Sequence, residues 1–181
     1  MKVSIFIDGN NFYHGLKYLY KNSRKFIDFN FEKFCEYLSN KRTIVNVFYY
    51  NASLDKTKDF EKYKSQQRFF EKLKKVPNLR LILCKLLKRK IKDTNEYYYI
   101  LKEDDIHMAV DMIEGVCDNK FDTAILVSGD GDFVPAVNSV KKRGKQVENV
   151  YFKNSSSRNL KELCDKSVEL TKERLDNFFE L

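Results

Sequence analysis

The chain alternates between short runs rich in apolar and β-branched residues and longer segments in which apolar residues recur at every third or fourth position. The short runs predict strands, and they cover residues 3–7, 43–50, 79–83, 123–127 and 146–152. The periodic segments predict helices, and they cover residues 11–20, 31–38, 55–75, 103–117, 133–143 and 172–179. Shorter signals at 160–164 and 168–170 predict the start of a helix and a short edge segment. This alternation predicts an α/β fold in which helices cover both faces of a central, mainly parallel sheet of about five strands.

The region after the third predicted strand departs from this pattern. Residues 85–92 are intensely basic, 93–95 have the composition of a turn, and 97–100 are aromatic. We interpret the region as a β-hairpin that extends from the sheet edge. Basic side chains beside aromatic rings suit RNA, because they hold phosphates while the rings stack on unpaired bases. The candidate RNA contacts here are Lys88, Arg89 and Lys90. The alternative is a protective edge strand whose lysines discourage pairing with other chains.

Two predicted strands end in acidic residues that are followed by glycine. Asp8 follows the first strand, and Asp130 and Asp132 follow the strand at 123–127. In open α/β sheets, ligands bind at the carboxyl ends of the strands, so the repetition favours a shared acidic pocket. Asp130 and Asp132 have an alternative role as the cap of the helix that follows them. For Asp8, the alternative is an ordinary Asp-Gly turn.

The predicted helix at 103–117 carries an acid on its apolar side. A helical wheel places an apolar arc toward the sheet, made of Ile106, Ala109, Val110, Ile113, Val116 and Cys117. Asp105 falls inside this arc, and an inward carboxylate is costly unless it is capped, paired or bound to a cation. N-terminal capping and metal binding both remain open for Asp105. The same wheel leaves Asp111 in solvent.

Length and charge restrict the class of protein and its partners. The 181 residues fit a single domain spanning 1–181, with no linker or change of composition to divide it. Lys and Arg total 34 against 26 Asp and Glu, and the net charge of +8 favours a polyanionic partner, nucleic acid first. Lysine-rich composition from a biased genome is the alternative. Lys153 and Arg158, in a polar serine-rich loop, are further candidate phosphate contacts.

Cysteine, histidine and hydropathy patterns exclude several classes. The four cysteines are far apart and form no C-x-x-C pair, which favours reduced thiols in a cytoplasmic protein. The chain has only two histidines, which excludes a histidine-rich metal centre. Asp8 interrupts the first apolar run, so we expect no signal peptide. No apolar run approaches the roughly 18 residues that a membrane helix needs, so we expect no membrane partner.

The acids together predict a metal site. Four aspartates from three separate elements are the candidates: Asp8, Asp105, Asp130 and Asp132. Crowded carboxylates raise one another's pKa unless a cation compensates their charge. Oxygen ligands without His or Cys suit Mg²⁺ or Mn²⁺. A metal held in this way activates water and stabilises phosphoryl charge, so the chemistry indicated is phosphodiester hydrolysis.

Three ordered motifs carry a resemblance to a known family. They are Ile-Phe-Ile-Asp-Gly-Asn-Asn at 5–11, Lys-Glu-Asp-Asp-Ile-His-Met-Ala-Val-Asp-Met at 102–112, and Ser-Gly-Asp-Gly-Asp-Phe at 128–133. With them the chain resembles the NYN domain, in particular its LabA-like (DUF88) branch, which is related to the PIN-domain nucleases. The resemblance implies a three-layer α/β/α PIN-like fold with strand order 3-2-1-4-5. It also implies Mg²⁺- or Mn²⁺-dependent ribonuclease activity.

Matching the motifs residue by residue assigns roles to particular side chains. The resemblance implies that the four aspartates named above are metal-binding and catalytic, with Asn11 and Ser128 as polar supports. It also places an acid at Asp111, against the helical wheel. The chain departs from the common pattern at Glu103 and Asp104, where small or apolar residues are usual, and this makes Asp104 a candidate substitute ligand.

Three functions follow from these observations. The first is a metal-dependent endoribonuclease acting on RNA. The second is an RNA-binding or regulatory domain that keeps the pocket with little or no turnover. The third, a haloacid-dehalogenase-like phosphatase, needs a second aspartate two residues after the first, and position 10 is Asn10. The sequence leaves a homodimer open.

Overall fold

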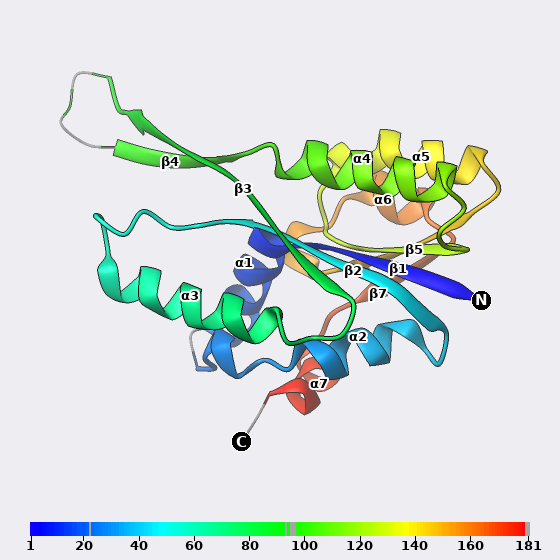
Figure 1. Cartoon of the computed structure of the whole chain (residues 1–181), viewed down its shortest axis with the longest axis horizontal. Helices are drawn as coiled ribbons and strands as arrows, with labels where there is room; N and C mark the ends of the chain where they lie inside the picture. Colours follow the sequence, from blue (N-terminus) through cyan, green and yellow to red (C-terminus); the bar gives the residue numbers. More distant parts are fainter. Residues whose placement is uncertain (22, 93, 95–96, 180–181) are drawn as a thin grey trace.

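The computed structural model describes residues 1–21, 23–92, 94 and 97–179. All its strands join one sheet in the order β4-β3-β2-β1-β5-β6-β7 (Figure 1). Their bounds are β1 (Lys2–Asp8), β2 (Thr43–Ala52), β3 (Leu79–Lys90), β4 (Tyr97–Lys102), β5 (Thr123–Val127), β6 (Gln146–Tyr151) and β7 (Lys166–Glu169). Neighbouring strands are parallel except β3 and β4.

The five strands predicted from the sequence are β1, β2, β3, β5 and β6. They lie in the order β3-β2-β1-β5-β6, which is the expected order 3-2-1-4-5 of the predicted strands, so the α/β class and strand order are confirmed. The sheet nevertheless has seven strands where about five were expected. At one edge, the hairpin strand β4 is hydrogen-bonded to β3. At the other edge, β7 extends the parallel pairing from β6. Lys-Ser-Val-Glu at 166–169 is too short and too polar to stand out as a buried strand.

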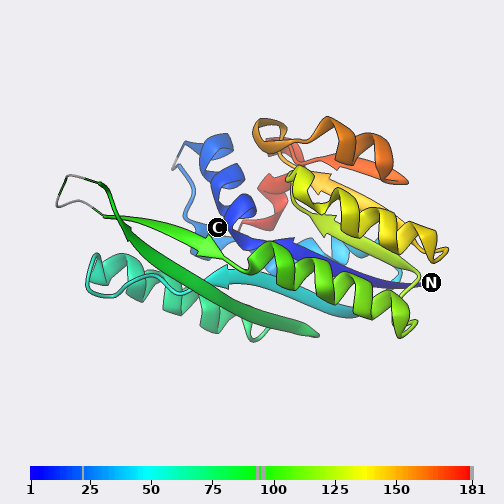
Figure 2. The ribbon, with the colours of Figure 1, turned by 90° about the horizontal axis from the view of Figure 1, so that it is seen from above.

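Helices cover both faces of the sheet (Figures 1 and 2). One layer contains α1 (Gly9–Tyr20), α2 (Phe31–Ser39), α3 (Phe60–Leu73) and α7 (Lys172–Leu175). The other contains α4 (Asp104–Cys117), α5 (Val134–Lys142) and α6 (Arg158–Leu163). Short 3-10 turns complete the described chain: η1 (Phe26–Asp28), η2 (Gly131–Phe133), η3 (Lys153–Ser155) and η4 (Asp176–Phe178).

The two layers bury separate cores. Beneath α1 and α2, the ring centroid of Phe12 lies 5.3 Å from those of Phe29, Phe31 and Phe34. Aromatic pairs at this separation add to the stabilisation from apolar burial, so this cluster fixes α1 against the sheet. On the other face, the core is built around Phe6 and the side chains of α4 and α5.

The helix predicted at 55–75 begins later, at Phe60. Asp59 caps it by accepting a hydrogen bond from the backbone N–H of Lys62 at 3.0 Å. Asp55 instead accepts hydrogen bonds from the backbone N–H and hydroxyl of Thr57, which closes a local turn before the helix. Asp side chains favour such turns, which explains the delayed start.

Beyond the sheet, β3 and β4 continue as a two-stranded arm (Figures 1 and 2). This confirms the predicted hairpin, although most of its turn, predicted at 93–95, lies outside the described residues. The ammonium of Lys58 lies 4.6 Å from the centre of the Tyr99 ring, and the Tyr99 hydroxyl donates a 2.9 Å hydrogen bond to Asp55. These contacts tie the arm to the loop before α3.

Candidate metal centre

Three carboxylates meet at the carboxyl edge of the sheet. Asp105, in the first turn of α4, and Asp130 and Asp132, in the loop after β5, each offer an oxygen within 4.8 Å of the other two. Asp105 and Asp130 are half-buried and Asp132 is exposed. Asp130 also caps η2, because its Oδ1 accepts a hydrogen bond from the backbone N–H of Asp132 at 2.9 Å. The two roles considered for Asp130, cap and member of an acidic cluster, therefore coexist.

This group suits a divalent cation. All three ligands are carboxylate oxygens, the donors that Mg²⁺ and Mn²⁺ take in proteins. Two oxygens on opposite sides of Mg²⁺ lie about 4.2 Å apart, twice the usual Mg–O distance. Because the observed group spans no more than 4.8 Å, small side-chain rotations are enough for the three residues to share one ion.

The electrostatic environment of Asp105 also favours a bound cation. Partial burial, and then the charges of Asp104, Asp130 and Asp132, raise the pKa of Asp105 to about 6. The pKa of Asp104 is raised as well, chiefly by burial. Carboxylates that hinder one another's ionisation are stabilised by a neighbouring cation.

Asp8 lies beside this group without belonging to it, as far as the described residues show. Its Oδ1 accepts from the backbone N–H of Asn11 at 2.9 Å, which caps α1. Its Oδ2 accepts from the Ser128 hydroxyl at 3.0 Å, and the same hydroxyl oxygen accepts from the backbone N–H of Asp130 at 3.1 Å. Burial raises the pKa of Asp8 to about 6 despite these hydrogen bonds. Ser128 thus links Asp8 to the loop that carries Asp130.

The orientation of α4 differs from the helical wheel. Met108, Met112 and Val116 are buried against the sheet, whereas Ile106 and Val110 are 69% and 45% exposed. The unbranched methionines fill the contact, and Gly115 leaves room for the Phe121 ring, which a side chain there would overlap.

This rotation brings Asp111 inward, so its predicted solvation is wrong. The buried Tyr50 hydroxyl donates a 2.7 Å hydrogen bond to its carboxylate. Asp111 is therefore held by β2 instead of projecting freely into water.

Further side chains hold the acidic loops in place. The Asn11 Oδ1 accepts from the Ser155 hydroxyl at 3.1 Å and from the backbone N–H of Gly129 at 3.4 Å. A side chain at Gly129 would overlap the carbonyl oxygen of Ser155, so the glycine lets two loops pack closely. Asn149, buried in β6, donates a 2.7 Å hydrogen bond to the carbonyl oxygen of Ser128.

Sequence reasoning missed Tyr50, Ser155 and Asn149. Only Asn149 left a signal, because it is an amide in the middle of a predicted strand. The other two resemble their neighbours in composition, and their roles follow from contacts between distant segments.

The candidate RNA contacts lie in two places. Lys88, Arg89 and Lys90 are exposed on the arm, where the Lys88 ammonium lies 4.4 Å from the centre of the Tyr97 ring. Lys153 is exposed on η3, close to Ser155. The Arg158 guanidinium is exposed but forms a 2.8 Å ion pair with Glu162.

The arm leads directly to the acidic cluster. β4 ends at Lys102, and α4 begins at Asp104. Between them, Glu103 adopts a positive φ of 76°, and its carboxylate forms a 2.9 Å ion pair with Lys85 at the base of the arm. The base of the arm is therefore joined to the helix that carries Asp105.

Comparison with known proteins assigns this chain to a family. The NYN domain model matches residues 2–171. Low amplitude and bright protein LabA from Synechococcus elongatus is 25% identical over 172 residues, which span 93% of this chain and 83% of LabA. A crystal structure of a protein of unknown function from Vibrio parahaemolyticus has the same fold, with a TM-score of 0.71 and 23% identity, covering 99% of this chain and 96% of that one.

The chain belongs to the NYN domain family, which groups it with the PIN-like nuclease domains. The resemblance to LabA-like proteins that the motifs indicated is confirmed. Within the described residues, every helix is too short or too polar to cross a membrane.

Proposed function

We propose that the protein is a Mg²⁺- or Mn²⁺-dependent ribonuclease that hydrolyses RNA phosphodiester bonds at the carboxyl edge of its sheet. The observation that carries this proposal is the convergence of Asp105, Asp130 and Asp132 within 4.8 Å in an NYN domain. The net charge of +8 supports a nucleic-acid substrate, because phosphates need cationic partners.

The side chains of this edge have distinct roles in the proposal. Asp105, Asp130 and Asp132 hold the metal, and Asp104 is near enough to add its charge to theirs. A bound ion supplies a water of lowered pKa and stabilises charge on the phosphoryl oxygens. Asp8 and Ser128 position the Asp130 loop through their hydrogen bonds. Asp111, held by Tyr50, fixes the rotation of α4 and with it the direction of Asp105.

Binding of RNA is assigned to the arm and to η3. The exposed lysines and arginine of the arm contact phosphates, and the exposed rings of Tyr97 and Tyr98 stack on bases. Lys153 contacts phosphate beside the metal centre. Arg158 contributes less, since its guanidinium is already paired with Glu162.

The cytoplasmic location stays a prediction. All four cysteines are free thiols, in keeping with that location.

Cleavage of a labelled single-stranded RNA tests the proposed activity. We expect cleavage with Mg²⁺ or Mn²⁺ and none with EDTA. Asp105→Asn and Asp130→Asn should each lower the rate at least about 100-fold, because several kcal/mol of charge stabilisation depend on the metal. Asp118→Asn, which removes an exposed acid after the far end of α4, should leave the rate unchanged and serves as the matched control.

Metal-independent cleavage, or full activity in both site variants, would refute the assignment. RNA binding without cleavage by any form would favour the RNA-binding or regulatory domain instead.

A further inference from the structure

A cavity of about 580 Å³ opens between α1, the segment 24–27 and α3. Among the described residues that line it, every charged side chain is basic: Lys17, Arg24, Lys25 and Lys62, with His14 beside them. Lys17 and Lys25 are exposed. Lys62 has a long 3.5 Å ion pair with Asp59, both side chains being well exposed, so solvent screens that pair. The cavity therefore favours an anionic ligand of the size that pockets of 300–1,000 Å³ hold.

One wall of the cavity is aromatic. Tyr13 is 41% exposed and lines the cavity from α1. Its ring meets those of Phe26 and His14 edge-on, each at a centroid distance of 5.3 Å, so neighbours fix its orientation. A partly exposed ring beside cations is the arrangement that binds an unpaired base and its phosphate.

The cavity reaches the edge where the acidic residues lie. Asn10, in the first turn of α1, and Asn51, at the end of β2, both line it. Asp8 caps that same turn of α1 and is hydrogen-bonded to Ser128 of the acidic loop. The cavity and the three carboxylates therefore flank the carboxyl end of β1, on opposite faces of the sheet.

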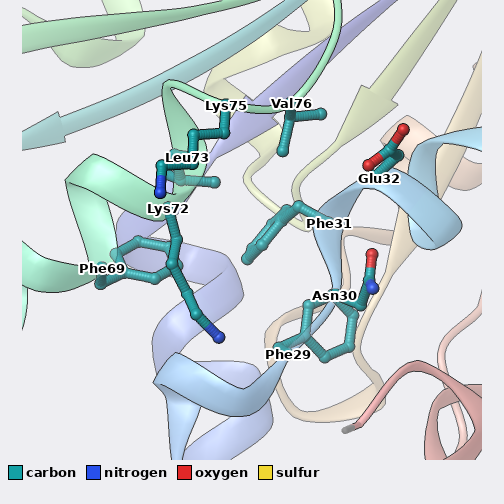
Figure 3. Close-up of a pocket in the computed structure, with 9 residues that line it drawn as sticks. All are labelled: Phe29, Asn30, Phe31, Glu32, Phe69, Lys72, Leu73, Lys75 and Val76. Atoms are coloured by element: carbon teal, nitrogen blue, oxygen red, sulfur yellow. The ribbon is translucent and has the colours of Figure 1, made fainter.

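A second cavity, of about 210 Å³, lacks these features (Figure 3). It lies between the start of α2 and the end of α3, with Phe31, Phe69 and Val76 around it. The Lys72 ammonium at its rim donates a 3.0 Å hydrogen bond to the carbonyl oxygen of Ile27. Its charged lining residues include an acid, Glu32, beside Lys72 and Lys75, so it lacks the purely basic charge of the larger cavity.

We propose that the larger cavity is a nucleotide subsite. It holds one nucleotide of the single-stranded RNA that is bound at the acidic cluster. Lys17, Lys25 and Lys62 contact the phosphates, and the base stacks on Tyr13. The assignment to RNA rests on the proposed function, whereas the preference for a phosphate-bearing, ring-containing ligand rests on the cavity alone.

Equilibrium binding of a fluorescein-labelled uridine 12-mer in EDTA tests this subsite without cleavage. The triple variant Lys17→Gln, Lys25→Gln, Lys62→Gln should bind more weakly and lower the slope of log K against log salt by about 2, at about 0.7 for each lost contact. The matched control neutralises three exposed lysines at the amino edge of the sheet: Lys2, Lys142 and Lys166. The control should keep the wild-type slope.

Substitution of the aromatic wall separates stacking from charge. Tyr13→Ala should weaken RNA binding about 5- to 150-fold, and Tyr13→Phe should retain wild-type affinity, because stacking needs the ring and not the hydroxyl. Equal affinities and slopes for the cavity triple and the control triple would overturn the subsite.

A parallel titration with uridine monophosphate distinguishes the two sources of a nucleotide. Loss of that binding in the cavity triple, with RNA affinity unchanged, would overturn the RNA assignment and identify a free-nucleotide site. These binding measurements are made in EDTA and do not depend on cleavage. If the protein binds RNA through the cavity but does not cleave it when metal is added, the proposed activity is refuted and the subsite stands.

Discussion

Asp8 and Asp105 lie at the same sheet edge, and burial is the largest cause that raises the pKa of each to about 6. Asp8 is buried, and both of its oxygens accept hydrogen bonds that position neighbouring loops. Asp105 is half-buried, and after desolvation the main influence on it is the charge of nearby carboxylates. Neutralising Asp105 therefore removes repulsion, whereas neutralising Asp8 also breaks hydrogen bonds.

Without metal, Asp105→Asn should stabilise the protein at neutral pH. The pKa of Asp105 is about 6 in the folded protein and near 3.9 in the unfolded chain, so the protonated carboxyl favours the folded state. This stabilisation is full below about pH 4 and is lost as pH rises through 6. In EDTA at pH 7.5 we expect the variant to melt about 2–4 °C above the wild type, for roughly 1 kcal/mol after solvent screening. The difference should shrink to about a third by pH 4.5, because the carboxyl of the unfolded chain becomes fully protonated only below about pH 4. Calorimetric melting curves at both pH values measure it, and a lower Tm for the variant at pH 7.5 would contradict the repulsion.

At the scale of elements, the sequence predicted best where one physical requirement dominates. β1 and β5 are short apolar runs because both of their faces are buried, and this made them easy to find. The rotation of α4 was predicted wrongly because a helical wheel ranks Ile106 and Val110 above methionine. Packing of Met108 and Met112, together with the close approach of Phe121 to Gly115, decides the orientation instead. Such contacts depend on segments that a wheel does not include.

The arm, in which residues 85–90 of β3 pair with residues 97–102 of β4, is the element whose function charge predicts most directly. Changing Lys88, Arg89 and Lys90 together to Gln should weaken binding of single-stranded RNA and lower its salt slope by about 2. All three side chains are exposed, so the fold should be retained, which circular dichroism checks. Unchanged affinity at low salt would exclude the arm as an RNA contact and leave its lysines the protective role of an edge strand.

For the whole molecule, the order of the strands is what assembles the site. β1 and β5 are adjacent in the sheet, so Asp8 and the 128–132 loop share an edge although more than a hundred residues separate them. The sequence motifs predicted this meeting. The cavity beside α1 was not predicted, because its basic residues come from α1, the segment before η1 and α3, and no single motif contains them.

The most direct test of the central claim is a titration of Mn²⁺ into the metal-free protein at pH 7.5, followed by calorimetry. We predict saturable binding to the wild type and to Asp118→Asn. For Asp105→Asn and Asp130→Asn, affinity should fall at least about tenfold, since loss of even an outer partner of a metal ligand costs 10- to 100-fold. Equal Mn²⁺ affinity in all four proteins, or none in the wild type, would contradict a metal centre at these carboxylates.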